Sequence, residues 1–161
     1  MRTTGETFTP YHYTSANCMT LFRKYAKPGC SVLDVGTGSG VLAIKAKEAG
    51  AGRVLAVDVL ESAIEDAKFN AEQAGVDVDV RWGYLNWEIG EKFDITIANL
   101  YPQQAEDFLQ YAGNTMTDDG ILILTWNKKV SYFFIEEYFD IVDCIGGEEN
   151  FPSYVLRRKK K

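Results

Sequence analysis

Acidic and glycine residues occur here at a spacing that can hold an adenosine-containing ligand. An aspartate, Asp34, stands two positions before a run of alternating glycines. The glycines are Gly36, Gly38 and Gly40, and a second acid, Asp58, ends the next apolar run. A glycine-rich turn between a strand and a helix lets the backbone approach a ligand that a side chain would block. A carboxylate at the end of the following strand can accept hydrogen bonds from both hydroxyls of a ribose. The pattern therefore predicts a cofactor site; the alternative is that the glycines only mark a tight turn.

The spacing of the glycines separates one cofactor class from another. The dinucleotide fingerprint G-x-G-x-x-G places its third glycine five residues after the first, whereas here the third follows after four. No lysine follows in the pattern of a phosphate-binding P-loop. The pattern D-x-G-x-G-x-G resembles the first motif of the class I S-adenosylmethionine (SAM) methyltransferases. That resemblance implies SAM as cofactor and S-adenosylhomocysteine as product.

The resemblance also implies roles for particular residues. In that family the glycine turn, which here includes Thr37, passes under the methionine part of SAM. The acid before the turn helps to hold the SAM ammonium, and the acid that ends the second strand holds the ribose. Carried over by position, these roles fall on Asp34 and Asp58.

The stretch from residue 8 to residue 126 is most similar to the ribosomal protein methyltransferases of the PrmA type. His12, Thr14, Ser15 and Cys18 resemble that family's amino-terminal H-P-T-T segment, which folds over SAM. The resemblance implies that the Thr14 hydroxyl meets the SAM carboxylate. The strand-like run 94–100 resembles the family's fourth strand, in which Asn99 would lie beside the transferred methyl group.

Three departures from the family pattern bear on cofactor and substrate. Tyr84 takes the place of the acid that contacts adenine, and its ring can pack on the adenine instead. Tyr13 replaces the proline of the amino-terminal segment. The chain also has no room for the separate domain with which PrmA-type enzymes recruit their substrate. The sequence therefore predicts either a different substrate or a partner protein that does the recruiting.

Methyl transfer from SAM is a direct displacement, so the enzyme must align the nucleophile and exclude water. No covalent enzyme intermediate is required. For an amine acceptor, a carbonyl oxygen that accepts from the N–H turns the nitrogen lone pair toward the methyl group. Asn99 is predicted to supply that oxygen, with a polar strand-end cap as the alternative role. Tyr101 is predicted to supply an aromatic wall beside the cationic methyl group. His12 is interpreted as a base, a residue at the cofactor entrance, or packing only.

The leading hypothesis is a SAM-dependent methyltransferase acting on a nitrogen of a protein or small amine. One alternative is an O-, C- or carboxylate-directed enzyme for a small metabolite. Another is a SAM-binding partner subunit without catalysis. A nicotinamide oxidoreductase is disfavoured because the glycine spacing is wrong.

The elements that would position these residues alternate between strand-like and helix-like patterns from residue 31 to residue 125. We expect a Rossmann-like α/β/α sandwich with a mostly parallel seven-stranded sheet and an antiparallel C-terminal hairpin. The expected strands are 31–35, 53–57, 76–82, 93–100, 121–124, 139–145 and 154–158. The expected helices are 16–25, 39–49, 62–74, 103–116 and 130–138. Asp118-Asp119-Gly120 is typical of a turn.

Length and composition predict one domain over residues 1–161, with residues 1–30 as an amino-terminal segment and helix. The net charge of −6 argues against general nucleic-acid affinity. The cysteines and the single histidine show no metal-ligand spacing. No apolar run approaches the ~20 residues that span a bilayer, and the first residues lack a signal-peptide core. We expect a soluble cytoplasmic protein without a metal.

Overall fold

In the part of the chain that the structure describes, seven strands form one mixed β-sheet in the order β3-β2-β1-β4-β5-β7-β6. The structure is a computed structural model that describes residues 1–3, 12–83 and 89–160. The strands are β1 Val32–Val35, β2 Val54–Asp58, β3 Asp79–Trp82, β4 Phe93–Ala98, β5 Met116–Thr125, β6 Phe139–Ile145 and β7 Ser153–Arg158. Strands β1 to β5 pair in parallel, and β7 runs antiparallel to both β5 and β6. The predicted sheet and its antiparallel ending are confirmed.

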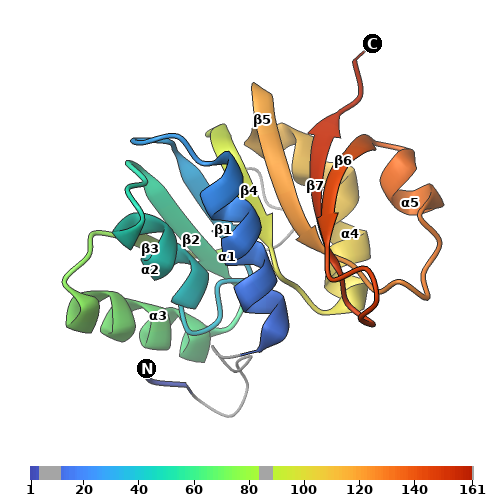
Figure 1. Cartoon of the computed structure of the whole chain (residues 1–161). Coiled ribbons are helices and arrows are strands. Elements are labelled where there is room, and N and C mark those ends of the chain that lie inside the picture. The colour runs from blue at the N-terminus through green and yellow to red at the C-terminus, as the bar shows by residue number, and fades with distance from the viewer. Residues whose placement is uncertain (4–11, 84–88, 161) are drawn as a thin grey trace.

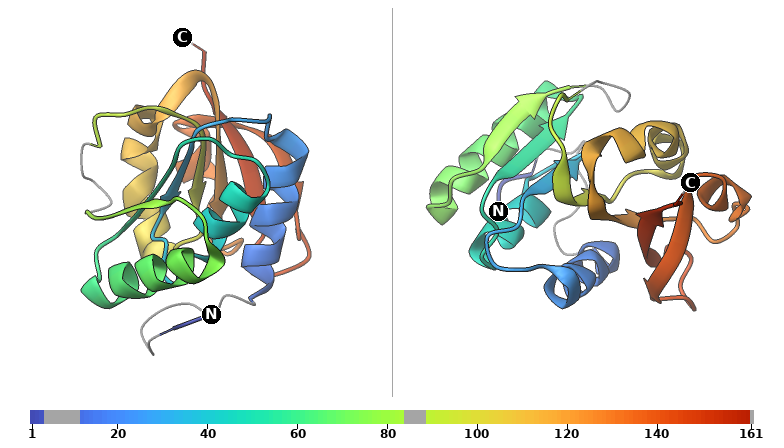
Figure 2. Two further views of the ribbon diagram at one scale, coloured as in Figure 1. Left: turned by 90° about the vertical axis from the view of Figure 1, so that its left-hand side faces the viewer. Right: turned by 90° about the horizontal axis from the view of Figure 1, so that it is seen from above.

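Helices cover both faces of this sheet (Figures 1 and 2). One face carries α1 Tyr13–Tyr25, α2 Val41–Glu48 and α3 Glu61–Ala74. The other face carries α4 Pro102–Ala112 and the short α5 Phe133–Glu136, with a 3-10 turn at Gly113–Thr115 between α4 and β5. The strands have fully buried runs such as Val-Leu-Asp-Val in β1, as expected of strands covered on both faces. Two apolar cores result, one on each side of the sheet, and the three-layer arrangement is confirmed.

Helix α1 is held against the last strands of the chain by a buried polar cluster. The Cys18 thiol lies 3.5 Å from Thr125 Oγ1 and 3.7 Å from Ser153 Oγ, and all three side chains are buried. Burial raises the pKa of the Cys18 thiol to about 11, so the thiol stays neutral. The cluster therefore ties the first helix to β5 and β7.

The carboxyl end of α1 is tied to β6 by charge. Lys24 Nζ lies 2.6 Å from Asp143 Oδ2, and the Tyr25 hydroxyl donates to the same oxygen at 2.7 Å. These two hydrogen bonds, that of Lys24 first, hold the pKa of Asp143 at about 2. Helix α1 is thus fixed to β6 as well as to β5 and β7.

Two sequence expectations on the C-terminal half are wrong in their bounds. The predicted turn at 118–120 lies inside β5, but the ladder to β4 passes from Phe93–Met116 directly to Ile95–Ile121, so residues 117–120 form an irregularity that is outside the β4 register. Gly120 fits there since a Cβ would lie 3.0 Å from the Phe93 carbonyl oxygen. The predicted helix over 130–138 is reduced to α5, because the Val130 N–H donates to the Asn127 carbonyl in a turn.

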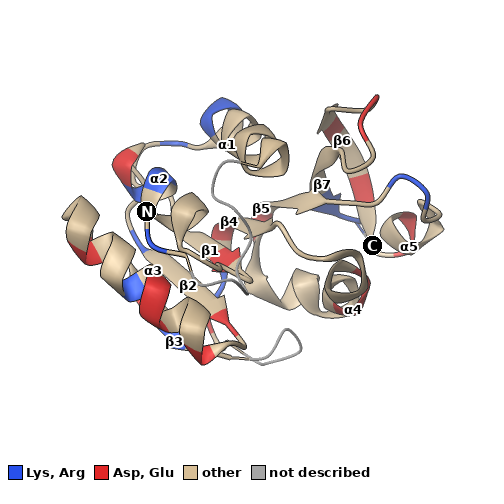
Figure 3. Ribbon diagram, turned by 90° about the horizontal axis from the view of Figure 1, so that it is seen from below, with Lys and Arg blue, Asp and Glu red and all other residues tan. Residues whose placement is uncertain are grey.

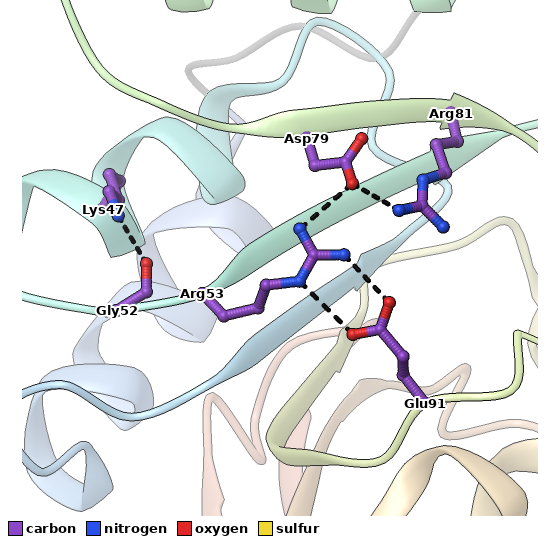
Figure 4. A network of polar contacts seen from close by, with 6 residues as sticks. All are labelled: Lys47, Gly52, Arg53, Asp79, Arg81 and Glu91. Atoms are coloured by element: carbon purple, nitrogen blue, oxygen red, sulfur yellow. Dashed lines mark hydrogen bonds and ion pairs between the residues drawn. The ribbon is translucent and has the colours of Figure 1, made fainter.

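An ion-pair network connects the start of β2, strand β3 and the segment before β4 (Figure 4). Arg53 donates to Asp79 at 3.0 Å and forms a two-point contact with Glu91 at 2.9 and 3.3 Å. Arg81 lies 2.6 Å from the same Asp79 oxygen. Single exposed pairs contribute about 0–1 kcal/mol, but this set links β2, β3 and the segment before β4.

Two negative findings apply to the described ranges 1–3, 12–83 and 89–160. No helix there combines the length and the apolar character needed to cross a membrane. No group of three or more His, Cys, Asp or Glu side chains in those ranges is placed to hold a metal ion.

Candidate functional site

A cavity opens at the carboxyl ends of β1, β2 and β4, which lie side by side in the middle of the sheet. From β1 the chain continues outward to β2 and β3, and it then returns to β4 on the other side of β1. This reversal of strand order is the switch point at which open α/β sheets bind ligands. The described residues that line the cavity are Ser15, Asp34, Gly36, Thr37, Gly38, Ser39, Val41, Leu42, Asp58, Val59, Leu60, Ala63, Asn99, Leu100, Tyr101 and Gln104. Most of the sequence-predicted site residues therefore come together at one place.

Asp34, the third residue of β1, is 1% exposed at the base of the cavity. Its Oδ2 accepts a hydrogen bond of 2.7 Å from the Thr37 hydroxyl. Burial raises the pKa of Asp34 to about 7, against the lowering effect of the bonds from Thr37 and the Ala43 backbone; the nearby Asp58 charge adds to the rise. A cationic group bound beside Asp34 would stabilise the ionised form.

The glycines of the turn between β1 and α2 have backbone conformations and close contacts that exclude a side chain. Gly36, Gly38 and Gly40 all have positive φ, at +70°, +56° and +84°. A Cβ on Gly36 would collide with Leu100, and one on Gly40 would lie 3.1 Å from Ala67 of α3. The first glycine thus keeps the cavity open, while the third allows α2 and α3 to approach each other; Gly40 itself caps α2 rather than lining the cavity.

Asp58, the last residue of β2, is oriented by two backbone amides. Its Oδ2 accepts from Gly38 N–H at 2.9 Å, and its Oδ1 accepts from Leu60 N–H at 3.0 Å. A carboxylate oxygen can accept a second hydrogen bond, so both oxygens remain able to bind hydroxyl groups. The turn and the second acid therefore form one rigid unit.

Asn99 and Tyr101 follow β4 and reach the cavity from the side opposite Asp58. Asn99 Nδ2 donates to Ser15 Oγ of α1 at 3.3 Å. Tyr101 precedes α4 as its N-cap residue, lines the cavity, and is 52% exposed. An amide and an exposed aromatic residue therefore lie at the β4 side of the cavity.

Other predicted residues are placed differently. Thr14 is 2% exposed and its Oγ1 lies 2.8 Å from His12 Nδ1; neither residue lines the cavity as described. His12 caps α1, since its Nδ1 accepts from the Thr14 N–H. Tyr84 lies outside the described residues. The roles of Thr14 and Tyr84 toward a cofactor stay predictions.

Sequence reasoning missed several residues that line the cavity, among them Ser39, Leu60 and Gln104, and it named Ser15 only as part of the amino-terminal segment. Ser39 stands inside the glycine motif, where its small polar side chain is the one sequence signal for a ligand contact. Its Oγ is buried and has no hydrogen-bond partner among the residues that the structure describes. Ser15 and Leu60 are set by tertiary packing, which motif spacing does not reveal.

The fold and the cavity together define the class I methyltransferase architecture. A ribosomal protein L11 methylase from Lactobacillus delbrueckii subsp. bulgaricus superposes with a TM-score of 0.85 at 29% identity, covering 97% of this chain and 83% of that one. The family profile "Ribosomal protein L11 methyltransferase (PrmA)" matches residues 5–126. The chain belongs to the ribosomal protein L11 methyltransferase (PrmA) family.

Curated relatives agree with this assignment. The ribosomal protein L11 methyltransferase of Dictyoglomus thermophilum is 45% identical over 149 residues, which are 92% of this chain and 47% of that protein. The corresponding protein of Caldicellulosiruptor saccharolyticus is 40% identical over 112 residues, 70% of this chain and 37% of that protein. The chain thus spans less than half the length of these relatives.

Proposed function

We propose that this protein is a SAM-dependent methyltransferase that transfers the methyl group to a nitrogen of a protein or small amine. The observation that carries the proposal is the cavity that joins Asp34, the glycine turn, Asp58 and Asn99. Membership of the PrmA family supports the proposal, because that family uses SAM. We further propose that residues 1–161 act as one catalytic unit.

The residues present fit the cofactor. Asp34 offers a buried carboxylate to an ammonium, Asp58 offers two oriented oxygens to a ribose, and Ser39 Oγ is buried without a partner among the described residues. When bound, SAM supplies an electrophilic methyl group. The fit favours a cation-bearing adenosine derivative over a neutral or anionic ligand.

The chain's own residues have three tasks in the proposed reaction. The glycine turn and the two acids hold the methyl donor. Since Asn99 Nδ2 donates to Ser15, its Oδ1 is left to accept from an incoming amine N–H and so to orient the nitrogen lone pair. Tyr101 borders the acceptor side, where its ring would stabilise the cationic methyl group and exclude water.

A lysine-bearing protein is our first choice of acceptor. The relatives carry the name ribosomal protein L11 methyltransferase, so we propose that protein as the first substrate to try. Figure 3 shows the molecule from the side of the carboxyl ends of the parallel strands, and Asp or Glu positions occur there on α3, α4, α5 and β6. Among the described residues that line the cavity, the charged ones are Asp34 and Asp58, and the whole chain carries a net charge of −6. This negative charge favours a basic acceptor over an acidic one.

The experiment has two stages. Calorimetric titration with SAM, S-adenosylhomocysteine and NAD should give micromolar binding of the first two and none of NAD. Labelled SAM is then incubated with ribosomal protein L11 and with a set of small amines, and label in protein lysine is expected. Absence of binding to either adenosyl ligand would overturn the cofactor assignment. Binding without transfer to free L11 would direct the search to a recruiting partner or to another acceptor.

A further inference from the structure

The first residues of the chain lie beside α3 and are held there by Arg2. Its Nε lies 2.8 Å from Oδ1 of Asp66, a residue with no exposed surface. Its guanidinium also lies 5.4 Å from the centre of the Phe69 ring and 4.0 Å from Glu65. A buried carboxylate needs a paired charge, so Arg2 and Asp66 depend on each other.

Asn70, one turn further along α3, connects this segment to the glycine turn. Its Oδ1 accepts from the Arg2 N–H at 2.7 Å, and its Nδ2 donates to the Arg2 carbonyl at 2.7 Å. The same Nδ2 also donates to the Ser39 carbonyl at 2.8 Å. Asn70 is 4% exposed, and both donors of its amide are used. One buried side chain therefore binds residue 2 and the cofactor turn simultaneously.

Ser39, at the other end of this chain of contacts, is one of the residues that line the cavity. Its carbonyl is held by Asn70, whereas its Oγ is 2% exposed and has no hydrogen-bond partner within the described part of the chain. A buried hydroxyl without a hydrogen-bond partner destabilises the protein, and a ligand that bonds to the hydroxyl recovers that loss. Because the residue lines the cavity, the ligand is the natural partner.

We propose that Ser39 is a cofactor-binding residue and that Asn70 is its positioning residue, held in turn by Arg2. The inference rests on the proposed binding of SAM. The Ser39 hydroxyl hydrogen-bonds the methionine part of the cofactor, and Asn70 keeps the turn in the conformation that presents it. Docking of residues 1–3 on α3 and binding of the cofactor then stabilise each other, because coupling between two sites is reciprocal.

The first test measures S-adenosylhomocysteine affinity by calorimetry. Ser39→Ala should weaken binding about tenfold, as expected for one lost hydrogen bond to a charged group. Binding of 5′-methylthioadenosine, which lacks the amino-acid part, should change less than twofold. Asn70→Asp, which keeps the shape and loses both donors, should weaken S-adenosylhomocysteine binding by a similar factor. Gln73→Glu is the matched control: it makes the same amide-to-acid change at an exposed position of α3 and should leave affinity unchanged.

The second test measures whether the bound ligand stabilises the docking of residues 1–3 on α3. Trypsin cleaves after Arg2 only when residues 1–3 leave α3, so loss of the Met1–Arg2 dipeptide, followed by intact mass, reports undocking. Saturating S-adenosylhomocysteine should slow this loss several-fold in the natural protein and have no effect on it in Asn70→Asp. The paired change of Arg2→Gln with Asp66→Asn, which leaves no buried charge unpaired, should weaken S-adenosylhomocysteine binding several-fold, and it keeps the coupling testable if Asn70→Asp fails to fold.

The outcomes separate this inference from the cofactor assignment. If the natural protein binds no adenosyl ligand, the proposed function fails and the inference fails with it. If it binds and Ser39→Ala and Asn70→Asp bind equally well, only the positioning inference is overturned. Protection of the Arg2–Thr3 bond that persists in ligand-saturated Asn70→Asp would likewise overturn the coupling through Asn70.

Discussion

Replacing the buried Asp34 by asparagine should change the stability of the protein by an amount that depends on pH. Asparagine has nearly the same shape and can still accept from the Thr37 hydroxyl, so the main change is the loss of an ionisable group. The pKa of Asp34 is raised from 3.8 to about 7 in the folded chain, chiefly by burial. The folded chain therefore binds this proton more tightly than the unfolded chain does.

The sign and size of the effect follow from that difference. A raised pKa in the folded state contributes stability below the unfolded pKa, and this contribution is lost as the pH rises toward 7. From pH 5 to pH 8 this contribution to the free energy of unfolding falls by roughly 3 kcal/mol. The fall occurs over the two pH units below the folded pKa of about 7, at about 1.4 kcal/mol per unit. An asparagine at this position has no proton to lose and bears no such cost. The variant should therefore gain about 3 kcal/mol on the natural protein over that pH range.

Urea unfolding of both proteins at pH 5, 6, 7 and 8, without cofactor, measures this directly. Taking the difference between the two free energies of unfolding at each pH cancels groups that titrate equally in both proteins. The difference should move in favour of Asp34→Asn from pH 5 to pH 7 and then level off. A difference that stays constant over the range would show that Asp34 is already ionised in the folded chain at pH 5. The argument from burial would then be refuted.

Three further substitutions test the site. Gly36→Ala forces a Cβ against Leu100 at a φ of +70° and should cost more stability than Gly29→Ala, where a Cβ meets nothing and the strain alone costs about 1–2 kcal/mol; thermal unfolding compares them. Asp58→Ala should weaken SAM binding by roughly 1.5–3 kcal/mol in calorimetry, and unchanged affinity would exclude it as the ribose ligand. Asn99→Ala should leave SAM affinity within about twofold and lower turnover at least about tenfold, the effect of ~1.4 kcal/mol in the transition state. Equal loss of affinity and turnover would make Asn99 a cofactor or structural residue instead.

The sequence was sufficient for the parts of the fold in which local pattern and tertiary structure agree. The helix expected over 62–74 is α3, Glu61–Ala74, because alanines at helical spacing meet a glycine stop at Gly75. The hairpin expected over 139–145 and 154–158 is β6 and β7 with shifts of at most one residue. The turn signal at 118–120 falls inside β5 at the point where the register with β4 shifts, so a strand with an irregularity stands where a separate turn was expected.

The candidate site shows the same division. Asp34, the glycines and Asp58 could be predicted because their spacing along a single βαβ unit is fixed by local geometry. The contact between Ser15 and Asn99, and with it the orientation of Asn99, could not be predicted, because the two residues lie far apart in the sequence. Ser39 escaped notice since its role depends on a buried partner on α3, Asn70, whose contacts only the folded chain reveals.

The attachment of α1 has a consequence for how the chain matures during synthesis. This helix leaves the ribosome well before its polar partners Thr125, Asp143 and Ser153, which lie more than 100 residues later in the chain. Because chains emerge from the amino terminus at about 5–20 residues per second, α1 must wait several seconds for the strands that fix it. Ser15, which α1 brings to the cavity, reaches its place only then. A nascent chain stalled before β7 should therefore already contain the β1–β4 half of the sheet while its cofactor cavity still lacks one wall.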